Sequence, residues 1–361
     1  MSQEKKHTLD ILLVGHYGGG PYRIERVKQA LEYYECNVIP FDTGKYFNRS
    51  TSFKKHYRNL KLKSLFGREL QKIKADLIHK IIEVRPDIVF YRDVLLFKYV
   101  DWRDLTEFSP HISICNVEMD MFSEGNNTYA WNQFRKSLKL FDLHFVFRKK
   151  NIKDFRDIGY KYAYLWEPSF IPWYHKLPGE FNEGKFYSDA VFVGHYENDG
   201  RKEYCEYLYK KGIDIKIYST NWKKFIKNSN PLYNCLHDPI YGDKYPQAVY
   251  ASKASLCFFS RLNNDELTER VFEIPAMGGL LVAERNERLK EIFEEGKEVL
   301  LFSSKEELLE HILFIKRYPE KAHKIKKAGR EKVIKSHSIF NRAVFALKII
   351  QDFIAKNVNN Y

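Results

Sequence analysis

The sequence lacks the features that mark secreted, cysteine-ligated or membrane-spanning proteins. Its 361 residues include five cysteines, which form no CxxC pair and show no metal-ligand spacing, so buried free thiols in a reducing cytosol explain them best. The apolar runs, such as residues 11–14, have the length of a strand and are far short of a membrane span. No signal segment opens the chain. We therefore expect a cytoplasmic protein that is soluble or attached peripherally to the inner face of a membrane.

The motifs of several enzyme classes are also missing. The sequence has no GxSxG nucleophile elbow and no Cys/His metal cluster. In place of a metal-binding DxD it has Glu118-Met119-Asp120, which offers only ExD. A mechanism that depends on a metal-held diphosphate is therefore disfavoured, and we expect neither a metal ion nor another cofactor.

The sequence does contain a globular composition and a repeating strand–helix pattern. Hydrophobic residues make up 44% and charged residues 30%, and the length is enough for two domains. Strands are expected at residues 10–15, 37–41, 87–91, 112–117, 143–147, 190–194, 213–218, 255–259 and 299–302, with helices between them that include 22–34, 69–84 and 306–317. Proline and glycine gather in residues 166–185, which reads as a linker. We expect an α/β protein with domains at 1–170 and 186–335, and a final helix in 336–361 that packs back on the first domain.

The formal net charge of +13 indicates an acidic partner or a set of solvated helix faces. One basic cluster lies between residues 54 and 80 with apolar residues interleaved, and a second spans residues 316–335. Attachment to an anionic membrane surface and solvated lysine-rich helices both fit this pattern. No nucleic acid partner is expected, because no recognised nucleic-acid motif accompanies the charge.

Two loops follow strands in equivalent positions. The tetrapeptide Val-Gly-His-Tyr occurs at residues 14–17 and 193–196, each time closing an apolar strand and opening onto a Gly-containing loop. This context predicts two Rossmann-like halves, in which ligands bind beyond the carboxyl ends of the strands. In the first loop, Gly18, Gly19 and Gly20 would let backbone N–H groups approach a phosphate or an acceptor. His16 is a candidate base, although a histidine without a catalytic role in a tight turn is the stronger alternative.

Further candidate residues have equally ordinary explanations. Arg201 begins a helix after the second loop and could pair with a diphosphate, or it could be a surface arginine. Asp120 follows a strand of the first half and could act as an acid, a base or a substrate-positioning carboxylate, or cap a helix.

The segment at residues 263–285 is the most informative part of the chain. Its Glu266, Arg270 and Glu273 are spaced to share one face of a helix that ends at a Gly pair before a strand, while Leu267 begins a core-facing stripe. Such a helix could hold a sugar or ribose by its hydroxyls. It could also be an amphipathic helix with an exposed salt bridge between Glu266 and Arg270, which spacing alone favours.

Several segments carry a family resemblance. DELTERVFEIPAMGG, LLVAER, FEEGKEVLLFSSKEELLEHI and AGREKVIKSHSIFNRA resemble the carboxyl-terminal domain of CgeB-like (spore-maturation type) glycosyltransferases, members of the GT-B superfamily. DAVFVGHYENDGR, RPDIVFYRD and ICNVEMD resemble earlier elements more loosely. The resemblance is specific over roughly the last hundred residues. It implies a GT-B fold of two Rossmann-like domains facing across a cleft, with the nucleotide-sugar donor held mainly by the second domain and the acceptor by the first.

The resemblance also assigns roles to residues. Many GT-B enzymes carry two Glu with seven residues between them, and the second, which commonly contacts the donor ribose, corresponds to Glu273. The first position is Asp265 here, which departs from the Glu of the family pattern. Donor binding would further involve Asn263, Arg270, Gly194, and Arg201 with the helix amino terminus near Leu267, which would stabilise the leaving diphosphate. Acceptor binding would involve Asp120 and residues 18–20.

The sequence as a whole therefore predicts a metal-independent glycosyltransferase that moves a sugar from a nucleotide-sugar to a glycan, lipid-linked or protein acceptor. The alternative is a GT-B-shaped carbohydrate-binding or spore-surface structural protein without turnover.

Overall fold

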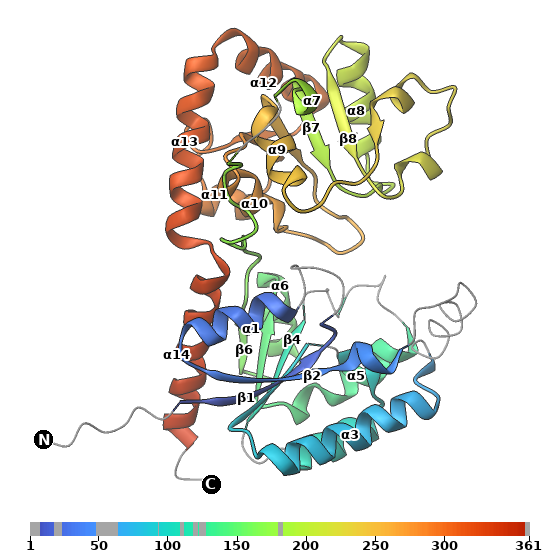
Figure 1. Ribbon diagram of the computed structural model, residues 1–361, viewed down its shortest axis with the longest axis vertical. Helices are drawn as coiled ribbons and strands as arrows, with labels where there is room; N and C mark the ends of the chain where they lie inside the picture. The colour runs from blue at the N-terminus through green and yellow to red at the C-terminus, as the bar shows by residue number, and fades with distance from the viewer. Residues whose placement is uncertain are drawn as a thin grey trace, which may run out of the picture. The chain divides into compact units, whose positions relative to one another are not determined.

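The protein consists of two compact units that each contain one parallel β-sheet (Figure 1). The computed structural model describes residues 8–17, 24–47, 64–92, 94–108, 112–117, 122, 128–179 and 183–357. The first unit comprises Met1–Glu167 and Phe340–Tyr361, and the second comprises Pro168–Ile339. The first unit is therefore built from both ends of the chain.

The first unit has a six-stranded sheet in the order β2-β1-β3-β4-β5-β6. Its strands are β1 Asp10–Gly15, β2 Asn37–Asp42, β3 Ile88–Tyr91, β4 Ile112–Val117, β5 Leu143–Val146 and β6 Ala163–Leu165. Its helices are α1 Ile24–Tyr33, α3 Arg68–Val84, α4 Tyr99–Phe108, α5 Tyr129–Ser137, α6 Lys149–Asp157 and α14 Ile339–Asn357. All the neighbouring strands of the sheet pair in parallel.

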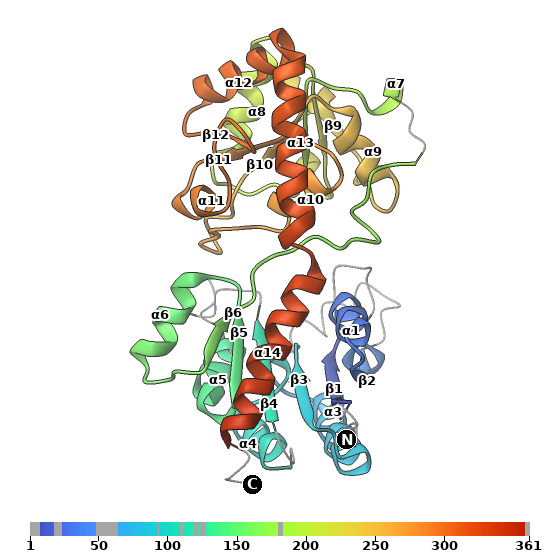
Figure 2. The ribbon, with the colours of Figure 1, turned by 90° about the vertical axis from the view of Figure 1, so that its left-hand side faces the viewer.

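Alternating residues of these strands face two layers of helices. Leu12 and Val14 of β1 belong to an apolar core that includes side chains of α3, α4 and α5. The helix α14 buries a stripe of small and aliphatic side chains, including Ala343, Ala346 and Ile350, at helical spacing. Figure 2 shows this helix running across the strands. The last segment of the sequence is thus part of the first sheet's core.

The second unit has a sheet in the order β12-β11-β10-β7-β8-β9. Its strands are β7 Ala190–Val193, β8 Ile215–Tyr218, β9 Leu236–His237, β10 Ala254–Cys257, β11 Leu281–Glu284 and β12 Leu300–Phe302. Its helices are α7 Glu183–Phe186, α8 Arg201–Lys210, α9 Lys244–Ala251, α10 Arg270–Ala276, α11 Glu287–Ile292, α12 Lys305–Arg317 and α13 Pro319–Ser336. One face packs against α8, α12 and α13, and the other against α9, α10 and α11.

The strand order fixes where a ligand would bind. The chain runs outward from β7 to β8 and β9, then returns to the other side of β7 to form β10. At such a reversal the loops after the two neighbouring strands diverge, which opens a crevice at their carboxyl ends. In the second unit this point lies between the loops that follow β7 and β10.

These features confirm the predicted α/β class and most of the predicted strands. The short strands β6 and β9 were not predicted. The helix predicted to contain Glu266 and Arg270 on one face is wrong in its start, because α10 begins only at Arg270, after a non-helical segment. Over the described residues, no helix combines the length and apolar character needed to cross a membrane.

Candidate functional site

The loop after β7 begins at a glycine with no room for a side chain. The backbone N–H of Gly194 donates to the carbonyl oxygen of Tyr218 at 3.1 Å, which continues the strand pairing. A Cβ at Gly194 would lie 2.6 Å from Cζ of Phe192. Gly194 therefore allows the loop to turn directly over the phenyl ring.

Arg201 fixes the shape of this loop from inside. Its side chain is 4% exposed, and its Nε donates to Asp199 Oδ1 at 2.7 Å while Nη2 pairs with Asp199 Oδ2. Its Nη1 donates to the carbonyl oxygen of His195 at 2.8 Å. The surface-arginine alternative is therefore wrong, and the guanidinium is already occupied by protein groups. A diphosphate could pair with it only by displacing Asp199.

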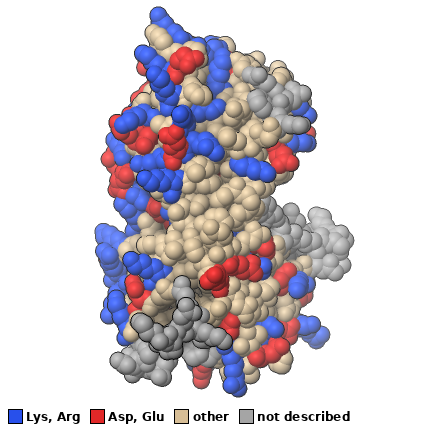
Figure 3. Space-filling model, turned by 60° about the vertical axis from the view of Figure 1, so that its left-hand side comes forward, with Lys and Arg blue, Asp and Glu red and all other residues tan. Residues whose placement is uncertain are grey.

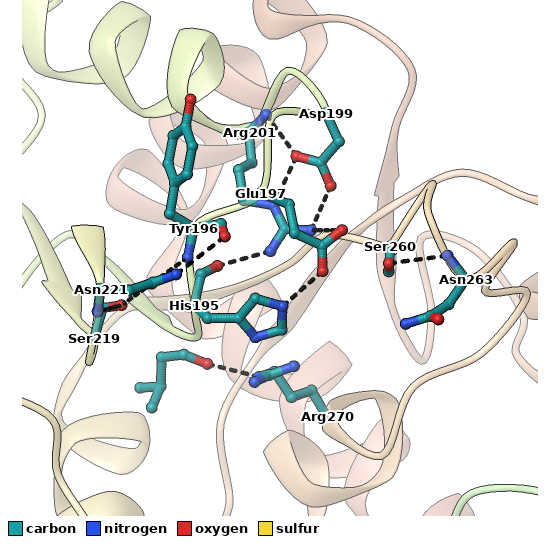
Figure 4. A network of polar contacts seen from close by, with 11 residues as sticks. His195, Tyr196, Glu197, Asp199, Arg201, Ser219, Asn221, Ser260, Asn263 and Arg270 are labelled. Carbon is teal, nitrogen blue, oxygen red and sulfur yellow. Dashed lines mark hydrogen bonds and ion pairs between the residues drawn. The ribbon is translucent and has the colours of Figure 1, made fainter. Parts of the chain in front are cut away.

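Asn221 joins this loop to the loop after β8. Its Oδ1 accepts a hydrogen bond from the backbone N–H of Tyr196 at 2.7 Å, and its Nδ2 donates to the carbonyl oxygen of Tyr196 at 3.3 Å. Ser219 Oγ donates to the same Oδ1 at 3.1 Å (Figure 4). Because both backbone groups of Tyr196 are satisfied, the residues on either side are held in place.

Arg270 brings a cation to the end of β7. Its Nε donates to the carbonyl oxygen of Val193 at 2.6 Å (Figure 4). Its Nη1 and Nη2 make no hydrogen bond or ion pair with the described residues. Burial alone would lower the pKa of Arg270, but the nearby Tyr245 and Glu273 raise it overall. A permanently charged guanidinium with two unused nitrogens suits an anionic ligand.

The loop after β10 presents amide and carboxyl side chains from a tight turn. Ser260 Oγ accepts from the N–H of Asn263 at 3.2 Å, and the carbonyl oxygen of Ser260 accepts from the N–H of Asp265 at 2.9 Å. Asn264 adopts a left-handed conformation with φ of 48°, which asparagine tolerates. These bonds hold a turn ahead of α10, which begins at Arg270, three residues after the amino terminus predicted near Leu267.

Glu273 lies in a buried cluster on α10. It is 4% exposed, its Oε2 accepts from the hydroxyl of Tyr245 at 2.9 Å, and its Oε1 lies 3.4 Å from Nε2 of His175. Nδ1 of His175 accepts from the N–H of Ile171 at 2.9 Å, so the proton of a neutral ring sits on Nε2 and points to Glu273. A ribose hydroxyl could reach this carboxylate only by replacing one of these two donors or sharing an oxygen with it.

A second acid, Glu284, is partly buried beside the loop after β10. Glu284 ends β11, and its Oε2 accepts from the N–H of Phe259 at 2.8 Å. Burial raises the pKa of Glu284, which outweighs this hydrogen bond and the nearby Arg261. The carboxyl therefore anchors the start of the loop after β10.

In the first unit, His16 lies at the carboxyl end of β1 beside a carboxylate. Its Nδ1 is 3.8 Å from Asp42 Oδ1, which also accepts from the N–H groups of Tyr17 at 3.1 Å and Gly44 at 2.9 Å. A Cβ at Gly44 would lie 1.9 Å from His16 Nδ1, so the imidazole packs on the glycine. The other predicted residues of this unit, Gly18, Gly19, Gly20 and Asp120, lie outside the described residues.

Arg270 is thus bonded to the end of β7 beside Gly194, Asn263 lies in the loop after the neighbouring strand β10, and Arg201 is bonded to the loop after β7. Sequence reasoning missed Tyr245 and His175, because neither lies in a periodic segment or a motif. Asp42 could have been found, since it is a polar residue directly after a predicted strand. Among the described residues, no group of three or more His, Cys, Asp or Glu side chains could hold a metal ion.

Comparison with known proteins gives this geometry a context. Residues 201–348 match the family model described as "Glycosyl transferase-like". Sucrose-phosphate synthase from Thermosynechococcus elongatus has 14% identity and a TM-score of 0.67, over 96% of this chain and 99% of that chain. Anabaena HepE in complex with UDP and glucose has 12% identity and a TM-score of 0.69, over 95% of this chain and 100% of that chain. The chain has the GT-B fold and carries a glycosyltransferase domain.

Another solved structure shows that this fold alone does not decide the reaction. A Listeria monocytogenes protein assigned as a UDP-N-acetylglucosamine 2-epimerase has 11% identity and a TM-score of 0.58, over 97% of this chain and 98% of that chain. A search of the curated proteins found no significant match. The predicted GT-B fold and glycosyltransferase class are confirmed, and the CgeB-like subfamily stays a prediction.

Proposed function

We propose that this glycosyltransferase moves a sugar from a nucleotide-sugar to a glycan, lipid-linked or protein acceptor without a metal ion. The observation that carries the proposal is Arg270, which is anchored to Val193 at the strand reversal and keeps two nitrogens for a ligand. A leaving nucleoside diphosphate gains negative charge in the transition state, and a preorganised cation stabilises that charge. UDP is a reasonable first candidate, because the structure of HepE holds UDP and glucose.

The remaining donor contacts would come from both neighbouring loops. Asn263 offers a side-chain amide with no hydrogen bond of its own to the described residues, which suits a phosphate or sugar hydroxyl. Asp265 would contact the sugar, and Glu273 would contact the ribose as the resemblance implies. Gly194 would let the backbone approach the donor closely.

The acceptor hydroxyl needs a base in an inverting transfer. His16 with Asp42 is the best-supported candidate, because a carboxylate beside an imidazole favours the protonated ring that forms during the reaction. Asp120 and the glycines at 18–20 remain candidates for acceptor contacts.

Titration calorimetry and a turnover assay test the proposal together. We expect UDP to bind the full chain, and Arg270→Ala to weaken this binding roughly tenfold or more. Lys290→Ala, which removes an exposed cation on α11, is the matched control. UDP-glucose with an acceptor mixture should release UDP in the presence of EDTA. A protein that binds no nucleotide in a panel of UDP, GDP, ADP and TDP would contradict the proposal.

The same assay separates the alternatives. Nucleotide binding without release of UDP from any donor would favour a carbohydrate-binding or spore-surface protein. Conversion of a UDP-sugar to its epimer without transfer would favour the reaction class assigned to the Listeria protein. Loss of UDP release in the presence of EDTA would contradict only the proposed independence of a metal ion, not the transfer reaction itself.

We also propose that an anionic membrane surface is a partner, through α13. This helix carries seven Lys or Arg residues and two Glu, a net charge of +5. On the face seen in Figure 3, Lys and Arg side chains are spread over the second unit with Asp and Glu among them. Of the basic cluster predicted at residues 54–80, residues 54–63 lie outside the described residues.

Vesicle sedimentation tests this attachment. Vesicles with 30% phosphatidylglycerol should bind the protein, and phosphatidylcholine vesicles should not. Lys324→Glu with Lys327→Glu, both exposed on α13, should release it, whereas Lys290→Glu on α11 should not. Equal binding by all variants would contradict a role for α13.

A further inference from the structure

An exposed histidine next to Gly194 is held by a buried carboxylate. His195 Nε2 and Glu197 Oε1 are 2.6 Å apart, and the side chains are 54% and 9% exposed, respectively. The exposed imidazole therefore has a fixed orientation, because the side chain of Glu197 that bonds to it is itself held by its surroundings.

The charges around Glu197 favour a positively charged partner. Its Oε2 has no hydrogen bond among the described residues and lies 3.5 Å from Arg201 Nη2. That guanidinium is already paired with Asp199. One cation therefore faces two carboxylates, which leaves negative charge on Glu197 for a further hydrogen-bond donor.

The hydrogen bond also decides which ring nitrogen is presented to a ligand. A carboxylate only accepts, so Nε2 of His195 carries the proton that points to Glu197. Nδ1 is then the nitrogen left for a ligand, and in the protonated ring it is a hydrogen-bond donor. Figure 4 shows the ring of His195 just after β7 and the side chain of Arg270, from α10, reaching the same end of that strand.

We propose that His195, oriented by Glu197, donates a hydrogen bond to the diphosphate of the nucleotide-sugar; this inference rests on the proposed function. His195 follows Val193 by two residues, and Arg270 is bonded to the carbonyl oxygen of Val193, so both donors converge on one strand end. As the bond between the sugar C1 and the phosphate oxygen breaks, its electron pair stays on that oxygen. The acceptor oxygen bonds to C1 and gives up its proton to the base. The hydrogen bond from His195 strengthens as charge grows on the phosphate. Glu197 is a positioning residue.

Calorimetry of the full chain with UDP, UMP and uridine tests this contact. We expect His195→Ala to weaken UDP binding roughly tenfold, with a smaller loss for UMP and none for uridine. His323→Ala, which removes an exposed histidine of α13, should leave all three affinities unchanged. Equal UDP affinity for wild type and His195→Ala would overturn the inference. Failure of the wild type to bind any nucleotide would instead contradict the proposed function.

Conservative variants separate positioning from folding. Glu197→Gln keeps an acceptor for Nε2 but removes the charge, and we expect it to weaken UDP binding about threefold. His195→Gln keeps an amide donor and should recover part of the loss seen in His195→Ala. A Glu197→Gln variant with wild-type affinity would overturn the role of Glu197.

Discussion

The hydroxyl of Tyr245 donates a hydrogen bond to Glu273 across 2.9 Å in the interior of the second unit. Burial raises the pKa of Tyr245 well above its ordinary value, and the charge of Glu273 raises it further. The hydroxyl therefore stays protonated and always serves as the donor. Because His175 approaches the other oxygen, the carboxylate of Glu273 has one fixed orientation.

Removing this hydroxyl should destabilise the second unit and disturb the site together. We expect Tyr245→Phe to lower the free energy of unfolding by about 1–3 kcal/mol, because a buried carboxylate loses a donor. Chemical denaturation measures the change. Tyr241→Phe, at a tyrosine that is 62% exposed, is the control and should have no effect. Equal stability of the two variants would mean that the hydrogen bond contributes little.

The proposed ribose contact of Glu273 can be tested by changing the ligand and the protein together. We expect Glu273→Gln to weaken UDP binding roughly tenfold and binding of the 2′,3′-dideoxy analogue much less, since a carboxylate accepts strongly from a ribose hydroxyl. Calorimetry of wild type and Glu273→Gln with each of the two ligands gives the coupling free energy between the carboxylate and the ribose hydroxyls. Equal losses for both ligands would show that Glu273 acts on the site without contacting the ribose, as its two protein donors would allow.

Replacing Gly329 by alanine should destabilise the protein, although the same change usually stabilises a helix. Replacement of an exposed helical glycine by alanine normally stabilises by about 1 kcal/mol. A Cβ at Gly329 of α13 would lie 2.2 Å from the carbonyl oxygen of Glu298, so Gly329→Ala should destabilise by about 1–3 kcal/mol. Lys335→Ala in the same helix should stay within about 0.5 kcal/mol. A more stable Gly329→Ala would contradict the close approach.

Glu307 should make stability depend on acid pH. Its two oxygens accept from Arg285 at 2.5 and 2.8 Å, which lowers the pKa of Glu307 to about 2. Since this pKa lies below that of the unfolded chain, the contribution is complete above about pH 4.5 and is lost as pH falls toward 2. Glu307→Gln should therefore destabilise by about 1–2 kcal/mol at pH 7, allowing for its partial exposure.

Thermal unfolding between pH 7 and pH 3 checks this pH dependence. The difference between wild type and Glu307→Gln should narrow as pH falls. Glu287→Gln removes a carboxylate that is 87% exposed and, within the described part of the chain, pairs only with Lys290, so it should match wild type throughout. A stability difference between wild type and Glu307→Gln that stays constant with pH would show that the ion pair with Arg285 does not cause it.

The sequence could predict the sheets because their strands are continuous apolar runs. Residues such as Ile11 to Val14 are buried on both faces, and such runs are typical of parallel strands. The strand β6 was not predicted because two of its three residues are only partly buried and it carries no comparable apolar run. Strand β9 is two residues long and gives no pattern at all.

The candidate site was less predictable because local bonds overrode spacing. The periodicity of residues 266–273 matched a helix, yet α10 starts only at Arg270. Ser260 accepts hydrogen bonds from two backbone N–H groups in the turn that precedes it. The burial of Arg201 depends on Asp199, a pairing that the sequence offers but does not require. The partners of Glu273 come from a linker and another helix, and only the folded chain brings them near.

The return of α14 to the first unit has a consequence for synthesis. This helix supplies Ala343, Ala346 and Ile350 to a unit whose other elements lie before residue 168. A ribosome that has made the first six strands has therefore not yet made the helix that covers them. The second unit, whose residues are contiguous, can fold on the nascent chain before the first unit is complete. A stop codon just before α14 would leave a finished second unit joined to a first sheet with one apolar face uncovered, a ready substrate for chaperones and proteases.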